Sequence, residues 1–507
     1  MANKKKTIKR SDYNRVLITE TIPRETPIIF SNDGLYRNCS SAAKSGAILQ
    51  DLLSKLVLPK NPPDNKPRIP YAYRVRKDYL DFRRLSLIHP RSQWDLRTLY
   101  EEYAEMILYL CSRSEFSIRY PYKIASRFYE RKSDATVNRY KTGRVMLLKR
   151  DPLTQYCPSF FAYKFNRQHK FFDSMEFCNL EKRFKYLWRV DVAKCFESIY
   201  THSLSWAIKD KEFTKKNKSV DSTFGQLFDK RMQSANNGET NGIVIGPEAS
   251  RIFAEVLFQA IDRRALVALQ GLQKPLNHEA DYAVRRYVDD IFIFTNSEDV
   301  AKTVYEKYAE ALELGNMRIN SQKTRHLSRP FLSEKSLAIR RASRGVNEFI
   351  GSFCKEKGNS ARLVPTKIRK PQSLTQHFIA SCREMCPGAP SGYDEVAPFL
   401  IGALLERIKK IVNVGSEPLL AKSKRDYAQA IRVLLEVMYF LYNTSPEVNS
   451  SYHLATAIIL ANRFAERHLA VRGAIGLILA RPWVWFDGAA GAESGGRESS
   501  TWVFCAI

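Results

Sequence analysis

Acidic residues are scarce in this chain of 507 residues: 53 of them face 81 basic residues, and the formal net charge is +28. Such a deficit favours a polyanionic partner such as nucleic acid. On charge alone, a merely basic soluble surface remains an alternative. Hydrophobic residues make up 44% of the chain, so a large core and roughly two or three domains are expected.

Long hydrophobic runs are missing as well. No uninterrupted apolar stretch reaches about 18 residues, the length that a membrane-spanning helix needs. The first residues, "MANKKKTIKR", are basic but have no apolar core behind them, so no signal peptide is indicated. We therefore expect no membrane partner and a cytoplasmic location.

Several common site patterns are also absent. The nine cysteines form no regular framework, and their odd number without a signal peptide indicates reduced thiols. His377, Cys382 and Cys386 lack the fourth ligand of a zinc site, so helix packing is the favoured interpretation there. Neither a His–Glu–x–x–His motif nor the Gly–Lys pair of a phosphate loop occurs, and nothing indicates a nuclease.

Composition divides the chain into four parts. Proline crowds residues 58–70, which predicts that residues 1–70 form a basic N-terminal arm and a proline-rich linker. Strand-like and helix-like segments alternate over residues 71–354. Apolar residues then recur at helical spacing, which predicts an α-helical domain over residues 355–486. Glycine, serine and alanine dominate residues 487–507, an expected flexible tail.

The stretch "RRYVDDIFIF" (Arg285–Phe294) places two adjacent carboxylates between short runs rich in β-branched and aromatic residues. This pattern predicts a β-hairpin with Asp289 and Asp290 at its turn. An ordinary aspartate-containing turn is the alternative, since aspartate is a common turn residue.

A third carboxylate, Asp191, ends another strand-like run in "LWRVDVAKCFESI" (Leu187–Ile199). Converging carboxylates are costly unless hard cations neutralise them, and Mg²⁺ prefers such oxygen ligands. Two Mg²⁺ ions about 3.5–4 Å apart can support nucleotidyl transfer. Because adjacent strand residues point to opposite faces, we assign Asp289 to the metals and place Asp290 nearby.

Between these segments, "TNGIVIGPEASRIFAEVLFQAID" (Thr240–Asp262) predicts a glycine-bearing loop that leads into a helix starting at Pro247. The glycines would allow a nucleotide or base pair to approach the backbone closely. Taken alone, a plain junction of loop and helix is the favoured interpretation.

The order of these motifs resembles the palm of reverse transcriptases. The motifs are Asp191 with Phe196, Asn241-Gly242 with Gly246-Pro247, Tyr287-Val288-Asp289-Asp290, and "INSQKT" (Ile319–Thr324). The resemblance covers roughly residues 71–354. It implies an α+β fold: right-hand fingers and palm with an antiparallel palm sheet, followed by an α-helical thumb or C-terminal domain.

The same resemblance implies the catalytic residues. Asp191 and Asp289 match the metal-binding aspartates and Asp290 the third carboxylate, while the backbone of Val192 would also face a metal. Lys323 matches a lysine that donates a proton to the leaving pyrophosphate or holds its charge. The implied cofactor is a pair of Mg²⁺ ions, with Mn²⁺ as a substitute.

Substrate contacts are implied in the same way. Phe196 matches the aromatic steric gate that leaves no room for a 2′-hydroxyl and so favours dNTPs. The segment "FSIRYPYKIA" (Phe116–Ala125) resembles the fingers of bacterial enzymes. The implied nucleotide-binding residues are Phe196, Ile245, Gly246, Arg119 and Lys123, and the implied nucleic-acid-binding residues are Tyr287, Asn241 and Gly242.

One motif departs from the common pattern. Many reverse transcriptases carry proline and glutamine in the glycine-bearing motif, where this chain has Val244-Ile245, and Ile245 cannot hydrogen-bond as glutamine does. This departure is similar to bacterial defence-associated reverse transcriptases of the abortive-infection type. The chain looks most like the b-type subunit of type 3 antiphage systems, which pair two reverse transcriptases with a non-coding RNA.

The resemblance implies an RNA-directed DNA polymerase, a nucleotidyltransferase of antiphage defence in the bacterial cytoplasm. The implied partners are dNTPs, a non-coding RNA, the DNA product and a second reverse transcriptase subunit in an oligomeric complex. Two alternatives stay open. One is template-independent or protein-templated synthesis of repetitive DNA, and the other is an RNA-binding scaffold that partners another polymerase.

Overall fold

The computed structural model describes residues 5–7, 9–20, 30, 32–40, 46–58, 66–76, 82–129, 159–216, 223–331, 334–357, 362–386, 392–414 and 419–469. The predicted tail, residues 487–507, lies outside them, as do residues 59–65 of the proline-rich segment.

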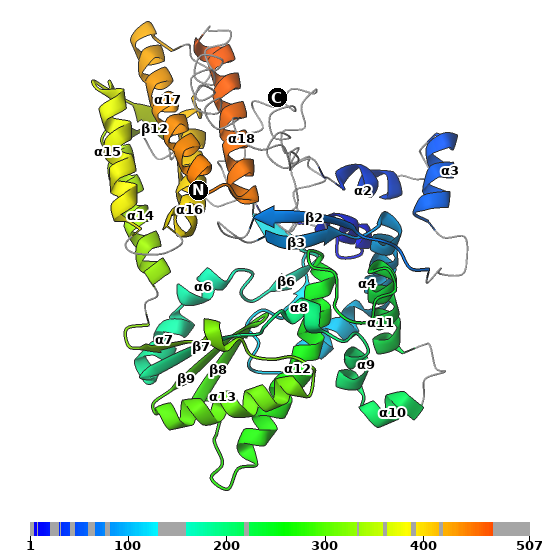
Figure 1. Cartoon of the computed structure of the whole chain (residues 1–507). Coiled ribbons are helices and arrows are strands. Elements are labelled where there is room, and N and C mark those ends of the chain that lie inside the picture. The colour runs from blue at the N-terminus through cyan, green and yellow to red at the C-terminus, as the bar shows by residue number, and fades with distance from the viewer. Residues whose placement is uncertain are drawn as a thin grey trace, which may run out of the picture.

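A four-stranded antiparallel sheet lies at the centre of the lower half of the molecule (Figure 1). Its strand order is β10-β7-β9-β8. The strands are β7 (Tyr186–Asp191), β8 (Tyr282–Tyr287), β9 (Asp290–Thr295) and β10 (Arg325–Ser328). The predicted palm, an antiparallel sheet with helices packed on it, is thereby confirmed.

Both faces of this sheet are covered, which explains its nearly continuous apolar strands. Val190, Ile291 and Ile293 point towards the core beneath α12 (Glu248–Gln270) and α13 (Glu298–Glu313). On the other face, a second cluster joins the sheet to α6 (Gln168–Phe172) and α7 (Met175–Arg183). Its sheet residues are Leu187, Ala283, Phe292 and Phe294.

The fingers flank the palm. A hairpin of β2 (Tyr71–Arg76) and β3 (Phe82–Leu87) stands beside the long helix α4 (Pro90–Cys111) (Figure 1). The other elements of this region are β4 (Pro121–Ile124), β5 (Arg127–Tyr129), β6 (Phe161–Tyr163), α8 (Cys195–Ser198), α9 (Ser203–Ile208), α10 (Lys211–Lys216) and α11 (Phe224–Ala235).

The N-terminal segment differs from the predicted arm, because part of it packs into the body of the molecule. Val16 and Leu17 in α1 (Val16–Thr19) are fully buried. The Nη1 atom of Arg15 donates to the carbonyl of Ala125, and the Glu20 carboxylate accepts from the amide of Ala249. The remaining elements are β1 (Lys5–Thr7), η1 (Tyr13–Arg15), α2 (Asp33–Ser40) and α3 (Ala47–Leu56).

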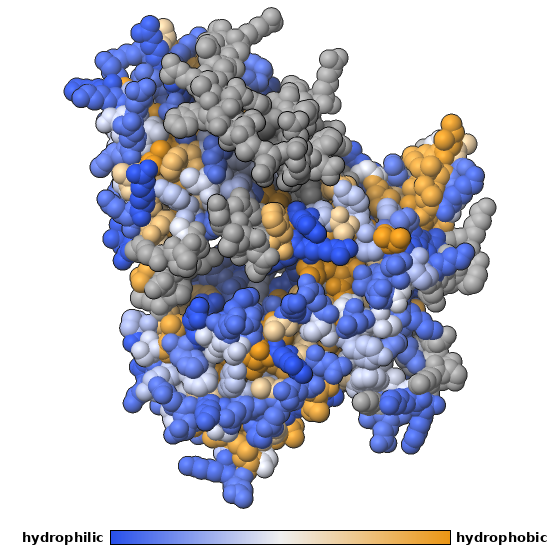
Figure 2. Space-filling model, in the orientation of Figure 1, coloured by the Kyte–Doolittle hydropathy of each residue, from blue (hydrophilic) through white to orange (hydrophobic). Residues whose placement is uncertain are grey.

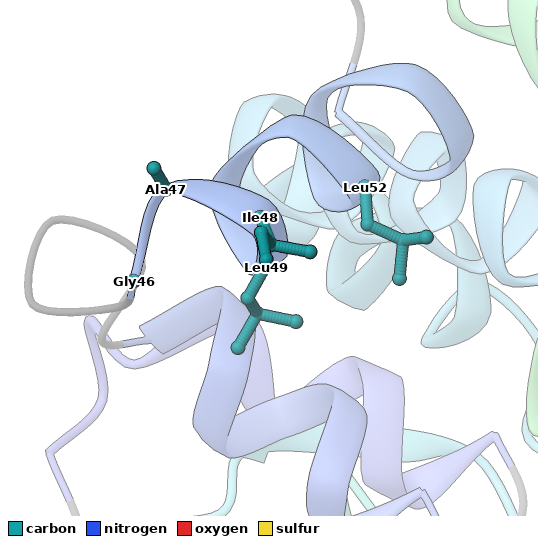
Figure 3. Close-up of a pocket in the computed structure, with 5 residues that line it drawn as sticks. All are labelled: Gly46, Ala47, Ile48, Leu49 and Leu52. Atoms are coloured by element: carbon teal, nitrogen blue, oxygen red, sulfur yellow. The ribbon is translucent and has the colours of Figure 1, made fainter.

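Helix α3 has two apolar faces. One face buries Leu53 in a small cluster with Leu17 and Trp94. The other exposes Ile48 and Leu52 beside a shallow apolar pocket (Figure 3), and hydrophobic side chains gather over this helix in the space-filling view (Figure 2).

The C-terminal region is helical, as its periodicity predicts. Its helices are α14 (Glu334–Gly351), α15 (Pro371–Glu384), α16 (Ala397–Ile411), α17 (Ala421–Thr444) and α18 (Val448–Phe464). A small hairpin, β11 (Cys354–Lys357) and β12 (Arg362–Pro365), and the short helices η5 (Gly392–Glu395) and η6 (Ala465–Leu469) complete it.

These elements share one apolar core, which includes Ala342, Val346 and Phe349 of α14. The structure therefore places α14 with the C-terminal helices, ahead of the predicted boundary at residues 354 and 355. Within the described ranges, no helix has the length and apolar character that crossing a membrane requires.

Candidate active site

The β8–β9 hairpin presents the aspartate pair at the edge of the palm sheet. Tyr287 pairs with Asp290 across the hairpin, so Val288 and Asp289 form a two-residue turn. Val288 has φ +60°, a left-handed conformation that costs a β-branched residue about 1–3 kcal/mol. The predicted hairpin is confirmed with Asp289 in its turn, whereas Asp290, also predicted at the turn, is the first residue of β9. The turn is under backbone strain.

The third aspartate lies on the neighbouring strand. Asp191 is the last residue of β7, and it pairs in register with Asp290 of β9. The register therefore brings Asp191, Asp289 and Asp290 to the same end of the sheet, although they lie far apart in sequence.

The titration behaviour of these groups reflects this crowding. Burial raises the pKa of Asp289, and the negative charge of Asp191 raises it further. Burial and the charge of Asp289 raise the pKa of Asp290 to about 6. Positive charge nearby therefore favours the ionised site.

Three nearby basic or polar side chains partly offset the negative charge of these aspartates. Lys323, in the short helix η4 (Ser321–Lys323), places Nζ 3.2 Å from Oδ2 of Asp191. The Nδ2 atom of Asn320 lies 3.5 Å from the same oxygen. The charge of Arg83, on β3, lowers the pKa of Asp289. The site thus brings the predicted Lys323 together with Asp191 and adds Arg83, which the motif comparison missed.

A divalent cation fits this donor set only with help from a substrate. No three histidine, cysteine or carboxylate side chains form a ready metal cage in the part of the chain that the structure describes. One oxygen of Asp290 accepts a 2.8 Å hydrogen bond from Nε2 of Gln168. The assignment of Asp191 and Asp289 as the principal metal ligands stays a prediction, and Val192 is buried next to Asp191. Mg²⁺ is commonly held by one or two carboxylates together with substrate phosphates.

The glycine-bearing loop is tied to the segment that carries Phe196. The amide of Ile243 donates to the carbonyl of Phe196 at 2.9 Å, and the amide of Gly242 donates to that of Ile199 at 2.8 Å. Asn241 forms an isolated β-bridge with Tyr200. Phe196 is partly buried against the core. The structure thus holds Asn241, Gly242 and Phe196 in one unit.

The close approach expected at Gly246 is made by the protein's own backbone. Gly246 has φ +137°, and a Cβ built there would lie 2.8 Å from the carbonyl oxygen of Ser86 on β3. The amide of Ser86 donates to the carbonyl of Ile245 at 2.9 Å. Strand β3 therefore packs directly on this loop.

The two predicted fingers cations lie in different surroundings. Arg119 is buried, with Nη2 3.0 Å from Oε1 of Glu248 and its guanidinium over the Tyr163 ring. Burial alone would raise the pKa of Glu248, but Arg119 and its other partners lower it to about 2. Lys123 lies on the exposed side of β4, against the Tyr122 ring.

Arg119 also lies near the β8–β9 hairpin. Its guanidinium lies 6.0 Å from the ring centre of Tyr287, the predicted nucleic-acid contact. Sequence reasoning missed Glu248 as the counter-ion, since no local pattern links residues so far apart. Roles for Arg119, Lys123 and Tyr287 in ligand binding stay predictions.

A family comparison identifies the domain. Residues 145–349 match the family model of reverse transcriptase (RNA-dependent DNA polymerase). The chain therefore contains a reverse transcriptase domain with the reverse transcriptase fold. The matched domain is of the nucleotidyltransferase class of RNA-directed DNA polymerases. No curated protein sequence matches the chain.

Solved structures of telomerase are distantly similar. Telomerase from Candida albicans in complex with a TWJ fragment of telomeric RNA is 12% identical over 85% of this chain and 63% of that chain, with a TM-score of 0.30. Apo telomerase from Candida tropicalis, truncated from the C-terminal domain, is 15% identical over 60% of this chain and 57% of that chain, with a TM-score of 0.31. The chain thus spans less than two thirds of the length of either telomerase. The assignment of the domain depends on the family model.

Proposed function

We propose that the chain is an RNA-directed DNA polymerase that joins dNTPs by two-metal nucleotidyl transfer and acts in antiphage defence. The observation that carries the proposal is the convergence of Asp191 and Asp289 at one end of the palm sheet, beside Lys323, within a reverse transcriptase domain. A scaffold has no need for carboxylates such as Asp289 and Asp290, whose pKa values are raised by burial and by nearby negative charge.

The residues divide the chemistry among them. Asp191, Asp289 and the backbone of Val192 would hold two Mg²⁺ ions, with Mn²⁺ as a substitute, and Asp290 would add negative charge. Bound Mg²⁺ activates a 3′-hydroxyl and stabilises the charge of the leaving pyrophosphate. Lys323 would give a proton to that pyrophosphate or neutralise it. Phe196 would exclude the 2′-hydroxyl of ribonucleotides.

The partners and biological role follow from the motif pattern. The Val244-Ile245 departure supports a defence-associated enzyme of the bacterial cytoplasm. Its partners would be a non-coding RNA, the DNA product and a second reverse transcriptase subunit in an oligomeric complex. The net charge of +28 is compatible with such polyanionic partners.

A second candidate function is template-independent or protein-templated synthesis of repetitive DNA by the same residues. The contact of Ser86 with Ile245 and Gly246 favours it, because protein backbone takes the close approach that the glycine offers. Both functions use the same carboxylates, so the product sequence separates them.

The test is dNTP incorporation by the purified full chain with Mg²⁺, with and without RNase pretreatment, followed by sequencing of the product. The Asp289→Ala, Asp290→Ala double variant should lose incorporation. The matched control removes the exposed acidic pair at the start of α13, Glu298→Ala with Asp299→Ala, and should keep it.

A product that copies RNA supports reverse transcription, and a repetitive product that survives RNase supports the second candidate. No incorporation by the wild-type chain, with its co-purifying partners added, would contradict both and leave the scaffold function. Incorporation that persists in the double variant would show that other residues carry the chemistry.

A further inference from the structure

Arg286 is a fully buried charge directly behind the catalytic turn. Its neighbour Tyr287 packs on the sheet face that carries Phe292, whereas the Arg286 side chain points to the opposite side of β8, towards α12. The backbone of Arg286 is fixed as well, because its amide donates to Phe116 at 2.7 Å and its carbonyl accepts from Ile118 at 2.9 Å. The residue therefore links the fingers, the palm helix and the hairpin.

The guanidinium is held by two carboxylates of α12. Nε and Nη2 donate to Asp262 over 2.8–3.1 Å, and Nη1 and Nη2 donate to Glu255 at 2.9 and 3.0 Å. Two further side chains hold these carboxylates: Gln259 donates to Glu255, and the hydroxyl of Tyr308 on α13 donates to Asp262. Such paired, planar contacts fix the position of the guanidinium.

One contact of this group reaches the active site. Nη1 of Arg286 donates to the carbonyl of Val288 at 3.1 Å. Val288 is the residue with φ +60°, and Asp289 follows it in the turn. A charged donor on this carbonyl therefore acts on the strained peptide unit that carries the metal-binding carboxylate.

We infer that Arg286 is a positioning residue for the catalytic centre: it holds the Val288 carbonyl and thereby keeps Asp289 in the geometry that binds metal. The inference rests on the proposed two-metal function. Glu255, Asp262 and Tyr308 serve the same purpose indirectly, since they fix the guanidinium. The alternative is that this buried cluster only stabilises the fold.

The test measures Mn²⁺ binding to the purified full chain by electron paramagnetic resonance. A non-hydrolysable dNTP analogue is present, which supplies the phosphate ligands but cannot be incorporated, so that the measurement does not depend on polymerase activity. Arg286→Lys keeps the charge but cannot span two carboxylates and a carbonyl. We expect it to weaken Mn²⁺ binding by about 10–100-fold, the usual effect of losing a group that orients a metal ligand. The matched control is Arg285→Lys, because Arg285 pairs with Glu176 and Glu279 on the other side of the strand.

A second substitution distinguishes positioning from stability. Val288→Gly removes the penalty of the positive φ, so the turn no longer depends on the Arg286 contact. Added to Arg286→Lys, it should restore a large part of the lost Mn²⁺ affinity, and alone it should bind Mn²⁺ nearly as the wild type does. A role in fold stability alone predicts no such rescue.

The outcomes are distinct. Wild-type-like Mn²⁺ binding by Arg286→Lys, or no rescue by Val288→Gly, would overturn the inference. If Arg286→Lys does not fold, Tyr308→Phe loosens the same cluster without removing a charge, and unchanged Mn²⁺ affinity in that variant would overturn it instead. A wild-type chain that binds no Mn²⁺ in the presence of the dNTP analogue would overturn the proposed two-metal function and the inference with it.

Discussion

The two cores of the molecule differ in what they bury. The palm and fingers bury charged side chains, among them Arg119, Glu248, Glu255, Asp262 and Arg286. Among the described residues from 334 onward, the buried polar side chains are the uncharged Thr375, Ser445, Ser450 and Thr456. Buried ion pairs add little net stability, but they fix geometry, whereas apolar contacts stabilise without directing side chains. The buried charged side chains therefore lie beside the candidate active site, whose proposed chemistry requires fixed positions.

The largest effect should come from the charged end of the palm sheet. Asp191→Asn should lower dNTP incorporation by about a thousandfold, because it removes a charge that we propose binds metal. Its thermal unfolding midpoint should stay the same or rise, since one of the crowded negative charges is lost. The control is Glu197→Gln on the exposed side of α8, which should keep activity. Substantial activity in Asp191→Asn would contradict the assigned role.

A substitution in the apolar C-terminal core should lower stability and leave metal binding unchanged. Leu434→Ala removes a fully buried side chain of α17 and should lower the free energy of unfolding by about 2–5 kcal/mol. Urea unfolding measures the loss, and Mn²⁺ affinity should not change. Arg432→Ala on the exposed side of the same helix is the control, with an expected loss of at most about 0.5 kcal/mol. Equal losses for both variants would show that α17 contributes no tight core.

The pH dependence of stability should reveal the free-energy cost of ionising Asp290 in the folded chain. Burial and Asp289 raise the pKa of Asp290 to about 6, above the unfolded value of about 3.9, so the ionised carboxylate destabilises the metal-free fold above pH 6. Asp290→Asn should therefore raise the free energy of unfolding by about 1–3 kcal/mol at pH 8.

That advantage should shrink as the pH falls from about 6 towards 4, where the wild-type carboxyl takes up its proton. Thermal unfolding of both chains without divalent metal measures the difference. Asp299→Asn, on the exposed first turn of α13, is the control and should show no such trend. A gain that is independent of pH would point to another cause.

The smallest effect concerns an apolar residue inside the charged region. Phe196→Ala should reduce the preference for dNTP over rNTP by about tenfold, because a ring that blocks the 2′-hydroxyl is removed. The ratio of kcat/KM for the two substrates measures this change. Phe196→Tyr keeps the ring and should retain the preference. Unchanged discrimination in Phe196→Ala would show that the ring only packs against the core.

Sequence patterns predict the local elements of both regions, but they do not predict the side-chain pairs that join distant parts of the chain. The C-terminal helices follow from periodic apolar residues, and the aspartate hairpin follows from its short strands. The counter-ions do not, since Arg119 and Glu248 lie 129 positions apart and Gln168 and Asp290 lie 122 apart. Such pairs become visible only when the chain folds.

Two other differences have local causes. The first residues are so basic that they suggest a free arm, and the short apolar run at Val16–Ile18 is too brief to signal a buried helix. At Gly246, the sequence indicates that something approaches the backbone closely, but it cannot identify Ser86 as the neighbour. A glycine in the sequence thus predicts a close contact with the backbone, but it does not predict which group makes that contact.

The buried N-terminal segment depends on contacts that are synthesised much later. Glu20 is bound by the amide of Ala249, which lies 229 positions later in the chain. At the usual rates of translation, about 5–20 residues per second, roughly 10–50 s pass between the synthesis of the two. Throughout that interval Val16 has no completed core to enter, because its apolar cluster includes residues of α12. The segment around Glu20 is thus made well before the helix that completes its contacts, and protection of this segment during that interval should raise the yield of folded protein.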